Sequence, residues 1–178
     1  MTTDGRKARG EARRRQLVEA TLAVIERDGL AGLTHRAVAE QAGVPLASAS
    51  YHFASLDALA MTAFDHVTDE LAVAFGTEDE PTLALLAAVL ADEVEQRPGL
   101  WLAGYELYLL AIRNPELRAG AWRWMEVIAD TFAPDLTGPQ RQAFQATVEG
   151  ICLHTLLREE PYSASEIETL LALSWPRA

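Results

Sequence analysis

The sequence predicts an all-α protein with a small N-terminal helical unit followed by a larger helical region. Apolar residues recur at helical spacing in nearly every segment between turn signals, and no stretch shows the strict alternation of a half-buried strand. At 178 residues, 49% of them hydrophobic, the chain can fill two globular units at most. These observations allow either one sizeable core or a small and a larger helical domain that share a long helix.

The ends of the chain and its apolar runs point to a soluble cytoplasmic protein. The N-terminus is charged and carries no apolar leader, and the longest apolar runs, such as residues 83–91, fall short of the ~20 residues that span a bilayer. The single cysteine, Cys152, excludes an intramolecular disulfide, which fits a reducing compartment. We therefore expect no membrane association.

Charge is distributed unevenly along the chain. The formal net charge is −11, yet residues 1–52 hold eight lysines and arginines against six acidic residues, while the remainder holds seven against twenty. Within residues 1–15, a basic N-terminal arm, the cations outnumber Asp4 and Glu11; they are Arg6, Lys7, Arg9, Arg13, Arg14 and Arg15. Such a run is often a solvated tail, but here it directly precedes the N-terminal helices.

Capping and breaking residues divide the N-terminal unit into helices. Gly29 is expected to end the first helix, Thr34 to cap a second that ends at Gly43, and Pro45 to open a third. Ser55 and Asp57 are expected to open a long fourth helix. The first helix should span about residues 11–28, the third 45–53, and the fourth should reach about residue 75.

The acidic segment 76–81, which contains Gly76 and Pro81, is expected to be a linker into the second region. Breakers there leave helices near residues 82–97, 99–113, 115–133, 139–160 and 163–173. The expected organisation is a basic arm (1–15), an N-terminal domain (16–60, its fourth helix continuing to about 75) and a C-terminal domain (76–178).

The two short helices around Gly43 have the spacing of a helix-turn-helix that binds DNA. A recognition helix must enter a groove about 12 Å wide, so the small side chains of Ala47, Ser48, Ala49 and Ser50 would allow a close approach. Tyr51 and His52 could then reach phosphates or base edges. The alternative is an ordinary helical hairpin.

Residues 16–60, QLVEATLAVIERDGLAGLTHRAVAEQAGVPLASASYHFASLDALA, closely resemble the DNA-binding region of TetR-family transcriptional regulators. The resemblance implies a homodimer that binds a palindromic operator, usually represses, and is released when a small molecule enters the C-terminal domain. It also implies that Thr34 and Arg36 contact phosphates. The chain departs from many relatives at two positions. Where they have an aromatic residue it has Ser50, with its own aromatic residue one position later, and where many have a lysine it has Leu56.

Two aromatic stripes in the second region suggest a pocket for a small apolar or aromatic effector. They consist of Trp101, Tyr105, Tyr108 and Ile112 on one helix, and Trp122, Met125, Ala129 and Phe132 on another. Such stripes are often plain core. The alternative is therefore a TetR-like regulator with a filled core and no small-molecule effector.

Two late helices carry more apolar surface than one core can cover, which predicts a two-fold dimer through a four-helix bundle. One face of the helix at 139–160 is made mostly of small residues, and the last helix has a similar apolar excess. The interface residues expected from these faces are Thr147, Gly150, His154, Leu170 and Leu171.

No motif supports a catalytic, metal or cofactor site. The four histidines are far apart, and no zinc-protease, paired-cysteine or serine-hydrolase pattern occurs. Cys152 is expected to be a small buried hydrophobe. A helical enzyme remains only a remote alternative, and we expect double-stranded DNA, a small-molecule effector and a second copy of the chain as partners.

Overall fold

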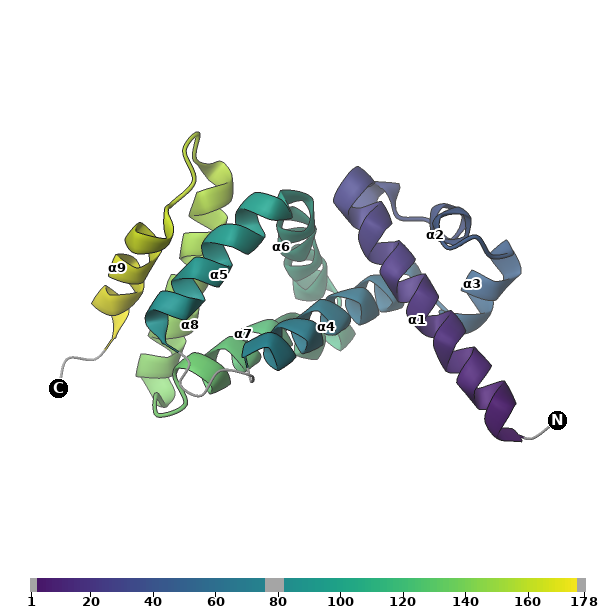
Figure 1. Cartoon of the computed structure of the whole chain (residues 1–178), viewed down its shortest axis with the longest axis horizontal. Helices are drawn as coiled ribbons and strands as arrows, with labels where there is room; N and C mark the ends of the chain where they lie inside the picture. The colour runs from purple at the N-terminus through teal and green to yellow at the C-terminus, as the bar shows by residue number, and fades with distance from the viewer. Residues whose placement is uncertain (1–2, 76–81, 176–178) are drawn as a thin grey trace. The chain divides into compact units, whose positions relative to one another are not determined.

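The computed structural model describes residues 3–75 and 82–175, and every regular element in these ranges is helical. Figure 1 shows the nine α-helices that they form. Their bounds are α1 Thr3–Asp28, α2 His35–Gln41, α3 Leu46–His52, α4 Leu56–Phe75, α5 Leu83–Gln96, α6 Pro98–Arg113, α7 Arg118–Phe132, α8 Gly138–Leu157 and α9 Ala164–Ser174, with short 3₁₀ helices η1 (Leu30–Gly32) and η2 (Pro115–Leu117). The predicted all-α fold is confirmed.

Helix α1 begins at Thr3 rather than near residue 11, so the basic arm forms the first turns of this helix instead of preceding it. Arginine and lysine favour helices, and the Lys7 Nζ lies 3.9 Å from Oε1 of Glu11, one turn later in the helix. The apolar pattern that marks a helix starts only where α1 meets the core, so the first turns of α1 could not be predicted from this pattern. The Arg6 side chain and the expected linker 76–81 lie outside the described residues.

The described residues fall into two compact units. The first contains the residues up to Val67 together with Leu102–Ala121, and the second contains Thr68–Trp101 together with the described residues from Trp122 onward. The boundaries therefore lie inside α4, near the start of α6 and inside α7.

The core of the first unit forms where α1 packs against α2, and α2 against α3. Leu17 and Ile25 of α1 are fully buried, as are Val38 of α2 and Ala49 of α3. Burying such side chains contributes roughly 1.5–3 kcal/mol each for the larger ones. This shared core holds the two short helices, which are too short to be stable alone.

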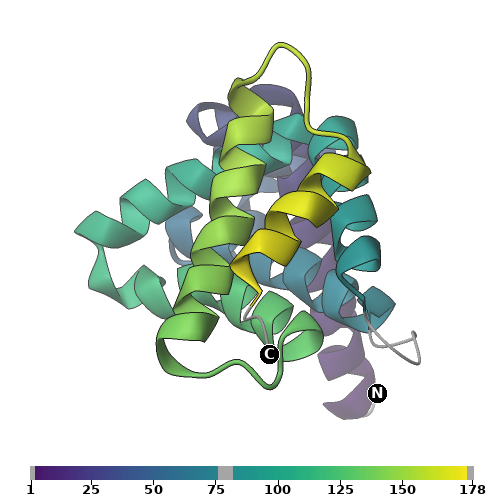
Figure 2. The same cartoon turned by 90° about the vertical axis from the view of Figure 1, so that its left-hand side faces the viewer.

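In the second unit, α5 packs against both α8 and α9. Figure 2 shows α8 and α9 side by side. Phe144 of α8 is fully buried, with its ring centroid 5.8 Å from that of Trp175 in an edge-to-face arrangement. At the start of α9 the Ser163 hydroxyl accepts from the Glu166 N–H and the Glu166 carboxylate accepts from the Ser163 N–H, which together form a capping box. The bond from the Ser163 N–H is the main cause that lowers the pKa of the Glu166 carboxyl.

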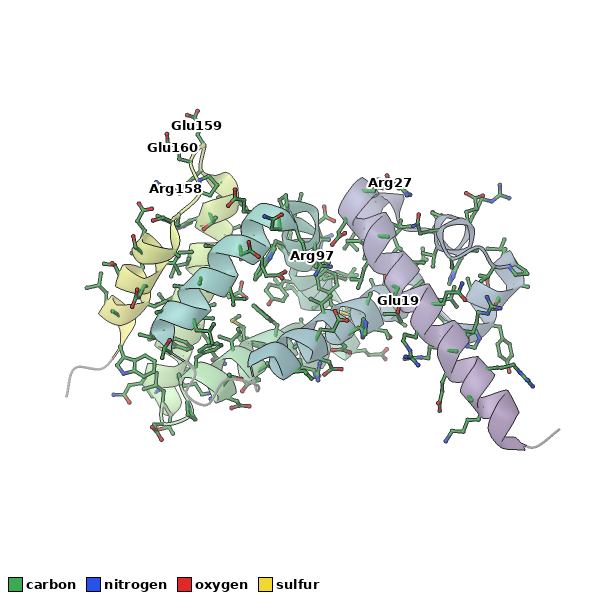
Figure 3. All side chains as sticks on the ribbon, in the orientation of Figure 1. Glu19, Arg27, Arg97, Arg158, Glu159 and Glu160 are labelled. Atoms are coloured by element: carbon green, nitrogen blue, oxygen red, sulfur yellow. The ribbon has the colours of Figure 1, made fainter. Side chains whose placement is uncertain are left out.

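The turn after α8 is held by Arg158, which Figure 3 labels beside Glu159 and Glu160. Its Nε donates to the Glu160 carbonyl at 2.9 Å, and its guanidinium lies 4.3 Å from the centroid of the Tyr162 ring. These contacts lead the chain from α8 into α9. Among the described helices, none combines the length and apolarity required to cross a bilayer.

Candidate nucleic-acid interface

Backbone geometry at Thr34 and Gly43 builds the turn between α2 and α3. The Thr34 hydroxyl accepts a hydrogen bond from the Ala37 N–H at 3.0 Å and so caps α2. Gly43 has φ +63°, a left-handed conformation that disfavours other residues, and it ends α2. Pro45 lies at the N-cap of α3, one position before the helix, rather than in its first turn. The predicted helix-turn-helix is therefore present.

Helix α3 presents one face to its own core and the other to solvent. Ala49 is fully buried and Phe53, just after the helix, is 4% exposed, whereas Tyr51 is 85% exposed. Ala47 and Ser50 are also exposed, while Ser48 and His52 are half-buried, with the Tyr51 and His52 rings 5.4 Å apart. Leu46, which the sequence reasoning missed, is also exposed on this helix. Leu46 could have been found from the sequence, because helical spacing places it beside Ser50 and Ala47, on the side of the helix away from buried Ala49.

Two α1 side chains fix the helix-turn-helix against the rest of its unit. Gln16 Nε2 donates to the Ala42 carbonyl in the turn at 2.7 Å. The Arg14 guanidinium lies 5.1 Å from the centroid of the Phe53 ring and donates to Thr62 Oγ1 at 3.5 Å. Because these bonds join α1 to the ends of α2 and α3 and to α4, they hold α3 in a defined orientation.

Three exposed arginines of the first unit are available for an anion. Arg9, Arg15 and Arg36 have no acidic partner within the described part of the chain. Arg27, which Figure 3 labels, is by contrast paired with Asp28 at 2.7 Å and also donates to the Gln41 side chain at 3.1 Å. Arg36 on α2 is the free cation nearest α3 in sequence.

The start of α4 carries no basic side chain. Leu56 is half-buried there, Asp57 lies in the first turn, and the Ser55 hydroxyl accepts from the Ala58 N–H at 3.1 Å. Since a lysine is absent at Leu56, any phosphate at this point would depend on backbone N–H groups.

The residues of the two aromatic stripes fall in different compact units. Tyr105 and Tyr108 belong to the first, half-buried with their rings 5.9 Å apart. Trp101, Met125 and Phe132 belong to the second, where Met125 and Phe132 are buried.

Trp122 does not lie with Met125 and Phe132 as expected, because it is 59% exposed. The buried side of α7 is centred on Met125, Ile128 and Phe132, which leaves Trp122 beyond its edge. Trp124 instead lies against Trp101, with ring centroids 5.4 Å apart. Its indole N–H is buried and has no hydrogen-bond partner among the described residues. Trp124 is thus a second residue that the sequence reasoning missed.

The residues expected at the dimer interface differ in their exposure. Thr147, Gly150 and Leu170 are half-buried and His154 is exposed, but Leu171 is fully buried within its own chain. Leu171 and Ile167 lie one turn apart, on the side of α9 that is in the core, so Leu171 has no surface left for a partner copy. Leu153 and Leu157 of α8 are exposed beside His154, and Leu153 was missed.

The structure places Cys152 in the core, 1% exposed, where burial raises the pKa of its thiol. In the described ranges no group of three or more His, Cys, Asp or Glu side chains is placed to hold a metal ion.

Comparison with known families covers both halves of the chain. Residues 17–61 match the family model for bacterial regulatory proteins of the tetR family, and residues 77–177 match the tetracyclin repressor-like C-terminal domain. The chain belongs to the TetR family. As a TetR-family protein it is a DNA-binding transcriptional regulator, and the first match covers the helix-turn-helix described above.

Individual relatives agree with this assignment. The chain is 33% identical to the transcriptional regulator BetI of Paraburkholderia xenovorans over 118 residues, a match spanning 61% of this chain and 59% of that regulator. It is 28% identical to BetI of Paraburkholderia phytofirmans over 170 residues, 85% of this chain and 86% of that one. The BetI proteins are transcriptional regulators, which agrees with the expectation that this TetR-family chain is not an enzyme.

Solved structures of similar proteins share the fold along nearly the whole chain. The multidrug binding protein EbrR complexed with ethidium superposes with a TM-score of 0.76 at 35% identity, covering 91% of this chain and 97% of that one. A TetR-family member from Streptomyces coelicolor A3 superposes with a TM-score of 0.73 at 34% identity, covering 93% and 99%. The N-terminal helix-turn-helix and C-terminal helical region are thus those of the TetR family.

Proposed function

We propose that this protein is a homodimeric cytoplasmic repressor that binds a palindromic operator through α3 and leaves it when an aromatic effector binds. In this proposal residues 16–60 form the DNA-binding domain, preceded by the basic residues 1–15, and residues 76–178 bind the effector and the second copy. The observation that carries the proposal is the surface of α3, where small exposed side chains flank Tyr51 while Ala49 is locked into the core.

Each part of this surface has a role in the proposed complex. Ala47 and Ser50 let α3 enter the major groove, Tyr51 reaches a base edge or phosphate, and exposed Leu46 suits a thymine methyl group. Ser48 and His52, being half-buried, lie at the edge of the contact. Arg36 contacts a phosphate, and the Thr34 hydroxyl, which accepts from Ala37 while capping α2, keeps its proton free to donate to another.

The net charge of −11 is compatible with this role because the charge is uneven. The free arginines Arg9, Arg15 and Arg36 all belong to the unit that contains α3. At physiological salt, electrostatic interactions between exposed charges are screened beyond about 8 Å, so nearby cations affect the contact with phosphates more than distant acidic residues do. The excess acidity of the chain slows non-specific association without preventing operator binding.

We infer that the second copy binds at a face of α8 around Gly150. Gly150 has open space where a Cβ would be, and Thr147, Leu153, His154 and Leu157 surround it on the helix. With Leu170 of α9, these residues give a self-complementary surface for a two-fold contact.

The effector of the proposal is an aromatic molecule bound in the second unit against Trp101 and Trp124, with Met125 and Phe132 behind them. EbrR has been crystallised with ethidium, proflavin and malachite green, which are aromatic dyes. The unpaired N–H of Trp124 would donate to an acceptor on the ligand and so remove the cost of leaving that donor unsatisfied. The contribution of Tyr105 and Tyr108 stays a prediction.

This proposal predicts that malachite green binds and weakens operator binding, and that Trp124→Phe raises its dissociation constant at least about tenfold. Calorimetric titration measures the ligand, and anisotropy of a labelled operator measures its release. Linkage requires that ligand and operator weaken each other by the same factor, about 5-fold to 150-fold.

Trp122→Phe is the matched control, because Trp122 is on the same helix but exposed, and it should change the dissociation constant less than about twofold. If malachite green, ethidium and proflavin all fail to bind, the chain is a regulator with a filled core and no effector of this class. Equal effects of the two tryptophan variants would remove the effector from Trp124.

A further inference from the structure

Helix α6 carries an exposed row of four side chains that its own unit leaves uncovered. Leu102 is 57% exposed and Leu109 is 63% exposed, and the exposed charges of Glu106 and Arg113 lie between and beyond them. The spacing i, i+4, i+7 and i+11 places all four on one side of the helix. The opposite side is the buried one, with Ala103, Leu107 and Ala111 in the core.

The two charges of this row have no ion-pair partner among the described residues. Glu106 has only Leu109 and Leu110 one turn ahead, and Arg113 has the same two leucines one turn behind, so neither charge can pair along its own helix. They lie seven residues apart, about 10.5 Å along the axis, on either side of Leu109. An apolar centre with one acid three residues before it and one base four residues after it is nearly complementary to itself when reversed.

We propose that this row is a self-association surface at which α6 of a second copy of the chain docks in the antiparallel direction. With the two-fold axis midway between Glu106 and Arg113, each Glu106 meets the Arg113 of the other copy, and the two Leu109 side chains meet at the centre. A parallel arrangement would place Glu106 against Glu106 and Arg113 against Arg113, which repel. The charges therefore select the antiparallel arrangement.

The end of the row fits this arrangement, because Leu102 of one copy would lie past the end of α6 of the other, which stops at Arg113. Leu102 belongs to the same compact unit as the rest of the row. The proposed contact involves α6 alone, does not include the α8 face around Gly150, and requires neither operator nor effector.

Disulfide trapping tests the proposal directly, because the only native cysteine is 1% exposed. Leu109→Cys should form a covalent dimer under mild oxidation, since the two positions meet at the axis. Leu102→Cys is the matched control: it is similarly exposed, yet its two copies would lie about 22 Å apart along the helices, far beyond the ~7 Å reach of a disulfide. No dimer from Leu109→Cys, or equal dimer from both variants, would overturn the proposal.

Charge reversal in the Leu109→Cys background tests the direction of docking. Glu106→Arg alone and Arg113→Glu alone should each slow cross-linking about tenfold, because each turns both ion pairs of the contact into repulsive pairs. The double variant restores both pairs with reversed sign and should recover the original rate. A double variant that cross-links no faster than the single variants would contradict the antiparallel arrangement, whatever the operator-binding assays show.

Discussion

Replacing Gly150 with arginine is expected to give a monomer that no longer binds operator. A Cβ added at Gly150 meets no neighbouring atom within 4 Å, so the substitution begins in open space, and replacing a mid-helix glycine favours the helix. In the proposed dimer the same arginine would enter the contact between two α8 helices and hold them apart. One recognition helix alone provides too little affinity, because the two half-sites of an operator act together.

Sedimentation and operator titration check this expectation, with Gly150→Ala as the control. The single methyl group of alanine should leave both dimer and operator binding intact while raising the melting temperature slightly. A Gly150→Arg protein that remains dimeric would place the two-fold interface away from this part of α8. A stable monomer that binds operator normally would contradict the need for two half-sites.

Arg36→Ala is expected to weaken binding to all DNA sequences alike and to flatten its salt dependence. Each dimer loses two phosphate contacts, so the slope of log affinity against log salt should fall in magnitude by about two, with an affinity loss of tenfold to a hundredfold at low salt. The physical basis is that Arg36 is exposed and has no acidic partner in the described ranges. Anisotropy titrations at several salt concentrations measure both quantities.

Two further variants sort the contacts by type. Ser50→Ala changes an exposed side chain of α3 and should alter which base pair is preferred while leaving the salt slope unchanged. Arg27→Ala removes an arginine already paired with Asp28 and should leave the slope unchanged as well. An Arg36→Ala slope equal to that of the wild type would mean that α2 does not meet the phosphates.

Local chemistry made the helix-turn-helix predictable. Thr34 caps α2 through its hydroxyl, Gly43 adopts the left-handed conformation that ends it, and Pro45 precedes α3. Each of these residues acts on its own neighbours along the chain, so its effect could be deduced without the tertiary structure. The same holds for Gly138, whose φ of +51° opens α8 where the breakers predicted a boundary.

Features that depend on packing could not be deduced in this way. The extra turns of α1 contain Lys7 and Arg9, which are exposed, so no apolar periodicity marked these turns. Leu171 and Leu173 are both leucines of α9, but only the core decides that the first is buried and the second 68% exposed. Likewise Trp122 and Trp124 differ by 200° around α7, and the sequence alone does not say which of them faces inward.

Selection of binding sites from random double-stranded DNA with the purified protein tests most directly whether α3 binds a palindromic operator as part of a dimer. The account predicts enriched sequences that are palindromic, with half-site centres about one helical turn, ~34 Å, apart or modestly more. It also predicts that Tyr51→Ala, which changes the most exposed side chain of α3, alters or abolishes the enriched sequence. Enrichment of no sequence, or of a single unrepeated half-site, would contradict the account.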